Sequence, residues 1–155
     1  MKKIFFLGLL ILLLNYGCGF TPKYKGFTGV DFILQLDNIT GDRSLNNAIV
    51  SQINRYKSGK SEYKIINLEL KSDFNKISVA KNSKGETTKY NLKAIIEIKL
   101  ISDDGTRELF LTEEFKIDKI SDSVEEDNYI KIIKKDFAQS FVERLILDIK
   151  KSNDI

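Results

Sequence analysis

Few residues of this 155-residue chain are able to do covalent chemistry. Its single cysteine, Cys18, lies between two glycines at the end of an apolar run, in the stretch LLLNYGCGFTPKY (12–24). A cysteine thiolate is a nucleophile, and a lone cysteine cannot form an internal disulfide. The chain has no histidine, so Ser–His and Cys–His relays and histidine-based zinc sites are excluded in their usual forms.

Adjacent acidic residues are the other candidates, because paired carboxylates can act in acid–base catalysis or bind a metal ion. Asp103-Asp104-Gly105 is a hairpin-type sequence, however, and the acidic run 125–127 falls where carboxylates complement a helix N-terminus. The regular spacing of oxygen ligands in a calcium loop is absent from the sequence. We therefore expect no catalytic residue, no metal site and no cofactor, and interpret the chain as a non-enzyme.

The first seventeen residues have the layout of a cleaved export signal. MKK precedes an apolar run of eleven residues, Ile4–Leu14, and Gly17 stands directly before Cys18. Eleven residues fall short of the about 20 needed to cross a bilayer, although an uncleaved short anchor remains the alternative. The segment resembles a bacterial lipoprotein signal, in which the cysteine becomes the acylated N-terminus. We expect loss of residues 1–17 and a lipidated tether over residues 18–29.

Apolar residues alternate with polar ones in four later stretches, which predicts four strands. These stretches are residues 30–36, 63–79, 89–100 and 109 to about 120. In the second stretch the alternation changes parity after Phe74, to Ile77 and Val79, which suggests a bulge or bend. The Asp-Gly sequence at 104–105 predicts a hairpin between the last two strands.

Two stretches have the three-to-four spacing of amphipathic helices. The first begins at Asp42 or Ser44 and runs to Tyr56, and the second has about 25 residues behind a capping box of Ser123 and Glu126. The apolar stripe of the second helix comprises Tyr129, Ile130, Ile133, Phe137, Phe141, Leu145 and Ile149, and its solvated side includes Lys134, Lys135, Glu143, Asp148 and Lys150.

The order β-α-β-β-β-α and the single apolar face of each element predict an α+β domain over residues 30–155. Two helices should pack on one face of a four-stranded sheet, because that arrangement buries every apolar face. The formal charge is only +3 and includes the two lysines of the export signal. Nucleic-acid binders usually show a strong basic excess, so we expect no nucleic-acid partner.

Three stretches, taken in order, resemble the LPS-assembly lipoprotein family (LptE, formerly RlpB), especially its alphaproteobacterial members. CGFTPKYKG (18–26) resembles the family's mature start, and ISVAKNSKGETTKYNLKAIIEIKL (77–100) resembles its hairpin. ISDSVEEDNYIKIIKKDFAQSFVERLILDI (120–149) resembles the acidic, then apolar, final helix. Gly19 after the cysteine favours sorting to the outer membrane in lipoproteins of this kind.

The resemblance implies a lipid-anchored, non-enzymatic protein on the periplasmic side of the outer membrane. It would plug and help assemble an LptD-type β-barrel of the lipopolysaccharide translocon, and bind lipopolysaccharide for delivery to the outer leaflet. The runner-up interpretation is a lipoprotein adaptor of another envelope machine, for barrel assembly or cell-wall tethering.

Lipopolysaccharide carries phosphates and carboxylates above acyl chains, so its binding surface needs cations near apolar residues. The predicted hairpin supplies five lysines: Lys81, Lys84 and Lys89 near its tip, and Lys93 and Lys99 along the exposed strand face. The alternative is that these lysines only keep the wet face of the sheet soluble and protect its edges.

Overall fold

The computed structural model describes residues 32–56 and 64–153. The elements in these ranges are β1 (Phe32–Gly41), α2 (Arg43–Asn54), β2 (Lys64–Lys81), β3 (Thr87–Ser102), β4 (Gly105–Asp118) and α3 (Ser123–Asn153). Their order confirms the predicted β-α-β-β-β-α succession. The expected export signal (1–17) and tether (18–29), with Cys18, lie outside the described residues.

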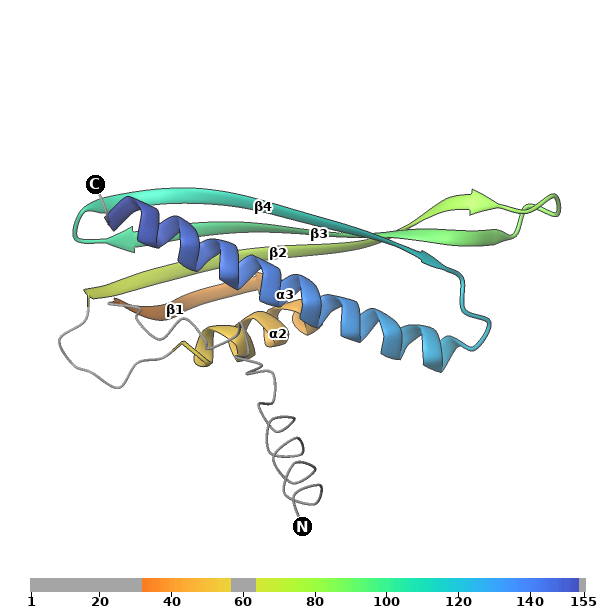
Figure 1. Cartoon of the computed structure of the whole chain (residues 1–155), viewed down its shortest axis with the longest axis horizontal. Helices are drawn as coiled ribbons and strands as arrows, with labels where there is room; N and C mark the ends of the chain where they lie inside the picture. Colours follow the sequence, from red (N-terminus) through yellow and green to blue (C-terminus); the bar gives the residue numbers. More distant parts are fainter. Residues whose placement is uncertain (1–31, 57–63, 154–155) are drawn as a thin grey trace, which may run out of the picture.

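The strands form one sheet in the order β1-β2-β3-β4. β1 is parallel to β2, and the other neighbours are antiparallel. A parallel pair needs a crossover connection, and α2 lies in the segment that makes it. Figure 1 shows α2 and α3 on the same side of the sheet, so the predicted α+β architecture, with both helices on one face, is confirmed.

The core lies between that face and the two helices. Successive side chains of a strand point to opposite faces, and the inward set of β3 is fully buried, as the alternation predicts. This buried set is Leu92, Ala94, Ile96, Ile98 and Leu100. Leu45, Ile49 and Ile53 of α2 and Ile133, Phe137, Phe141, Leu145 and Ile149 of α3 complete the core. Tyr129, expected in the same stripe, is exposed instead.

The bulge or bend predicted after Phe74 is present farther along the strand, at Val79. β2 pairs with β3 in an unbroken register from Asn67 to Ser78, and the register shifts only between Ser78 and Lys81. Ile77 and Val79 are each 49% exposed at this end of the strand. Ile77 and Val79 therefore do not belong to the core, and the change in the alternation of apolar residues after Phe74 marks where the core ends along β2.

The helix starts match the predictions at α2 but not at α3. Asp42 caps α2, and its Oδ1 accepts a hydrogen bond of 2.7 Å from the Leu45 N–H. The cap of α3 is Asp122, whose Oδ1 accepts from the Glu125 N–H at 2.8 Å, so the predicted Ser123 cap is wrong by one residue. α3 also extends to 31 residues, longer than expected.

The β3–β4 hairpin is confirmed, with Ser102 opposite Gly105. Asp103 and Asp104 form the loop between these two residues. Gly105, which follows the loop, has positive φ. No helix within the described ranges is long and apolar enough to cross a bilayer.

Candidate functional site

The end of the β2–β3 hairpin is held by a compact turn over residues 82–86. The Asn82 Oδ1 accepts hydrogen bonds from the backbone N–H groups of Lys84 (2.9 Å) and Glu86 (3.0 Å). The Gly85 N–H donates to the Asn82 carbonyl at 3.0 Å, and Gly85 has φ of +81°, a conformation that favours glycine. These bonds fix the conformation of the turn.

This hairpin end extends beyond both helices and beyond β4 (Figure 1). The register of β4 with β3 ends at Asp118 opposite Lys89, so the residues farther out form only two strands. We call the end of the hairpin, residues 77–89, the hairpin arm; its outer part, residues 81–88, is two-stranded, whereas Ile77 and Ser78 still lie opposite β3 residues that pair with β4. It carries exposed lysines beside the exposed Ile77 and Val79, the combination expected of a surface that meets a lipid with a charged headgroup.

The five candidate lysines fall into two groups. Lys89 pairs with Asp118 at 2.9 Å, Lys93 with Glu114 at 3.0 Å and Lys99 with Glu69 at 3.3 Å. Lys81 and Lys84 are exposed on the hairpin arm and have no ion pair with any residue that the structure describes. The arm therefore presents two cations without carboxylate partners, while the strand lysines are neutralised by their neighbours.

Lys89, Lys93 and Lys99 lie on the sheet face opposite the helices, which we call the open face. Lys71 also pairs there with Glu97 at 3.2 Å, and the Lys93 ammonium and the Asn91 amide hold the pKa of Glu114 below its ordinary value. Acids and bases alternate across the strands, so this face has little net charge. A balanced polar surface favours contact with another polar surface over capture of a strong anion.

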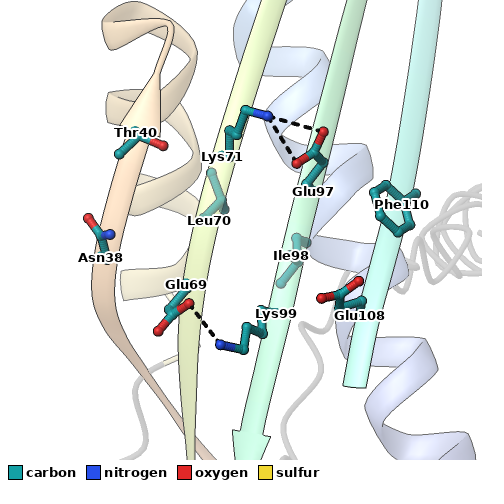
Figure 2. A pocket seen from close by; sticks show the side chains of 10 residues that line it. All are labelled: Asn38, Thr40, Glu69, Leu70, Lys71, Glu97, Ile98, Lys99, Glu108 and Phe110. Atoms are coloured by element: carbon teal, nitrogen blue, oxygen red, sulfur yellow. Dashed lines mark hydrogen bonds and ion pairs between the residues drawn. The ribbon is translucent and has the colours of Figure 1, made fainter. Parts of the chain in front are cut away.

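A hollow of about 250 Å³ lies on the open face, and Figure 2 shows ion pairs on β2 and β3 along it. Asn38 and Thr40 of β1 line one side, and Phe110 of β4 lines the other. The Phe110 side chain is 65% exposed, the largest apolar exposure among the residues around the hollow. An aromatic ring in such a setting is typical of protein contacts.

Sequence reasoning missed a buried polar cluster between α3 and the start of α2. Lys134, expected on the solvated side of α3, is buried, and its Nζ lies 2.8 and 2.9 Å from the two carboxylate oxygens of Asp42. The Ser72 hydroxyl donates to Asn46 Oδ1 at 2.7 Å in the same cluster. The sequence did contain a signal: Lys134 is three residues before Phe137 and four after Ile130, a spacing that places it on the apolar side of α3.

Opposing effects act on the Asp42 carboxyl. Burial alone would raise its pKa, but the Lys134 ammonium and the N–H groups of Leu45 and Ser44 outweigh it and hold the pKa below the ordinary 3.8. Asp42 is therefore ionised at neutral pH and joins α3 to the first turn of α2. The cluster is a structural clamp rather than a reactive site.

A second internal ion pair ties the base of the hairpin arm to the start of α3. Lys76 pairs with Glu126, and the Lys76 Nζ lies 4.1 Å from the centroid of the Tyr90 ring. The Lys76 ammonium lowers the pKa of Glu126, which also accepts a hydrogen bond from the Ile120 N–H at 3.3 Å. In the described part of the chain, no group of three or more acidic or cysteine side chains could hold a metal ion.

No protein-family model matches the chain, and no curated protein matches its sequence. Among solved structures, rare lipoprotein B from Shewanella oneidensis is similar, with a TM-score of 0.55 and 12% sequence identity over 77% of this chain and 96% of that chain. A candidate lipoprotein from Caulobacter crescentus CB15 is similar with a TM-score of 0.51 and 9% identity, over 78% of this chain and 90% of that chain. The chain therefore has the fold of these two proteins.

Proposed function

We propose that this chain is a lipoprotein of the LptE type, anchored on the periplasmic side of the outer membrane through Cys18. It plugs and helps assemble an LptD-type β-barrel, and it binds lipopolysaccharide for delivery to the outer leaflet. The fold shared with rare lipoprotein B supports this proposal. The observation that carries it is the hairpin arm, which combines unpaired cations with exposed apolar side chains.

The arm matches the two chemical parts of lipopolysaccharide. Lys81 and Lys84 lack carboxylate partners among the described residues, so their ammonium groups are available to phosphate or carboxylate oxygens. Ile77 and Val79 offer exposed apolar surface on the same arm, and burial of such surface against acyl chains is favourable. Lys89, Lys93 and Lys99 contribute less, because each would first have to leave its carboxylate.

The open face supports the plug role. The lumen of an outer-membrane barrel is polar, so a protein inside it needs a polar surface of matching charge. The ion pairs across β2, β3 and β4 supply such a surface, and the exposed Phe110 of the edge strand β4 supplies an apolar contact beside them. The same face would also suit an adaptor of another envelope machine, which is the alternative function; an adaptor has no need to bind lipopolysaccharide.

The test is charge reversal at the two unpaired lysines, Lys81→Glu with Lys84→Glu, in the full chain. Binding to purified lipopolysaccharide, measured by surface plasmon resonance, should weaken about tenfold or more, because two charge-assisted contacts become repulsive. The melting temperature should hardly change, since both side chains are exposed.

The matched control is Arg43→Glu with Lys151→Glu, which changes the net charge equally at exposed positions away from the arm. Its binding should stay within about twofold of the parent protein if the position of the charges decides affinity. Equal binding by the arm variant and the parent protein would remove the arm as the lipopolysaccharide site and would favour the adaptor.

A further inference from the structure

We propose that the groove between α2 and α3 binds a phosphate-bearing ligand, as a second anion site on the helical side of the sheet. The groove has a volume of about 440 Å³, within the range of about 300–1,000 Å³ usual for small-molecule sites. Three of its lining residues are cationic: Arg55 of the turn after α2, and Lys131 and Lys135 of α3. This inference goes beyond the proposed function and does not depend on it.

Helical spacing explains why these groups line one groove. Lys131 and Lys135 are one turn apart, so they lie on the same side of α3. Ser44, Ser51 and Arg55 are separated by intervals of seven and four residues, which places them along one side of α2. The opposite side of α2 is buried in the core through Leu45, Ile49 and Ile53, so the groove-lining side faces away from the sheet.

The charge of the groove is one-sided. None of its lining residues is acidic, and Arg55, Lys131 and Lys135 have no ion pair with any residue in 32–56 or 64–153. The open-face hollow, by contrast, contains glutamates beside its lysines. Like charges gathered without counterions repel one another and raise the local concentration of anions. An anionic ligand would relieve this repulsion.

The neutral groups of the groove favour phosphate among anions. The Ser44 and Ser51 hydroxyls and the Asn47 and Gln52 amides line it together with the three cations. Phosphate oxygens accept hydrogen bonds from both kinds of donor, and amides can also pair with the hydroxyl groups of a sugar or glycerol. Among the described residues that line the groove only Ala48 is apolar, whereas protein interfaces are usually built around large apolar or aromatic anchors. An acidic peptide is therefore the less suitable occupant.

The experiment is a titration of the full chain, labelled with ¹⁵N in a neutral detergent, with inorganic phosphate, glucose 1-phosphate and phosphatidylglycerol in separate arms, the lipid being added as mixed micelles with the same detergent. Each arm follows backbone amide shifts. The amides of residues 44–52 and 131–135 should shift and saturate with at least one phosphate compound. Stronger binding of glucose 1-phosphate indicates a soluble sugar phosphate, and stronger binding of phosphatidylglycerol, with phosphatidylcholine in the same detergent inert, indicates a lipid headgroup.

The variant Lys131→Gln with Lys135→Gln should bind the effective compound about tenfold more weakly, because it loses two charge-assisted contacts. The control Lys116→Gln with Lys151→Gln removes the same charge at exposed positions outside the groove and should retain parent affinity. The arm variant Lys81→Glu with Lys84→Glu should also retain it, which separates failure at this groove from failure at the hairpin arm.

Three results would overturn the proposal. The first is the absence of saturable shifts in the two groove segments with all phosphate compounds, and the second is parent-like affinity in the Lys131→Gln, Lys135→Gln variant. The third is tighter binding of a hexaglutamate peptide than of every phosphate compound, which would identify the groove as a contact for an acidic protein.

Discussion

Lys134 shows how a single charged side chain holds together elements that are distant in the sequence. A buried ammonium group is unfavourable unless it is paired, and Lys134 pairs with both carboxylate oxygens of Asp42. Its Nζ also lies 4.0 Å from the centroid of the Phe74 ring. Asp42 in turn caps α2, so one ion pair connects α3 with the β1–α2 junction.

Lys134→Met should lower the free energy of unfolding by about 2–3 kcal/mol at pH 7, because Asp42 stays partly buried without its partner charge. Methionine keeps most of the apolar stem, so packing changes little. The control is Lys135→Met, at the adjacent exposed position, which should change stability by less than about 0.5 kcal/mol. Urea denaturation measures both, and equal stabilities of the two variants would contradict the clamp role of Lys134.

The same pair predicts how the effect depends on pH. The folded-state pKa of Asp42 lies below its ordinary 3.8, so the ionised carboxylate stabilises the folded state above that value. This contribution is lost as the pH falls through the lower folded-state pKa, where Asp42 becomes protonated. The stability difference between the parent protein and Lys134→Met should therefore be largest near neutral pH and shrink below about pH 3.8.

At the scale of elements, the junction of β1 with α2 is the most sterically restricted turn in the fold. Gly41 has φ of +103°, and a Cβ atom there would lie 1.8 Å from the Ser72 carbonyl oxygen of β2. The Asp42 N–H donates to the same Ser72 residue, to its hydroxyl at 3.1 Å. β1 can therefore end beside β2 and lead directly into α2 only if residue 41 has no side chain.

Gly41→Ala should destabilise the protein by more than about 3 kcal/mol, because a left-handed conformation and a backbone clash act together. Gly85→Ala is a suitable control, since Gly85 also has positive φ, at +81°, but has open space around it. The free energy of unfolding of that variant should fall by only about 1 kcal/mol, the cost of the left-handed conformation without a clash. Urea denaturation at pH 7 checks both; similar losses would show that contact with Ser72 is unimportant.

At the scale of the whole molecule, placing both helices on one side of the sheet gives two different surfaces. The helical side has the cationic groove, and the open face has balanced ion pairs with Phe110 at one side of its hollow. The hairpin arm projects past both (Figure 1). The proposed sites for a phosphate-bearing ligand, a barrel wall and lipopolysaccharide are therefore on separate parts of the described structure.

Phe110→Glu should reduce co-purification of a barrel-sized partner from membranes solubilised in mild detergent, because it removes the largest exposed apolar side chain of the open face. Leu147→Glu is the matched control on the outer side of α3, where the leucine is 46% exposed, and it should leave the partner bound. Quantitative mass spectrometry of the purified complexes measures both, and partner retained equally by the two variants would exclude the open face as the contact.

The same preparations test the expected anchor. Mass spectrometry of the N-terminal peptide should show acylated Cys18 as the first residue. A peptide that retains residues 1–17 would contradict the proposed lipid anchor, whatever the outcome at Phe110.

The sequence alone determined the order of the elements and the apolar face of most of them, because burial leaves a periodic record in neighbouring residues. It did not determine that β1 runs parallel to β2, that Lys134 is buried, or that Arg55, Lys131 and Lys135 line one groove. These features depend on which elements pack together, and residues far apart in the chain meet only in the folded state. The local periodicity of the sequence carries no information about these long-range contacts, so they became evident only in the folded structure.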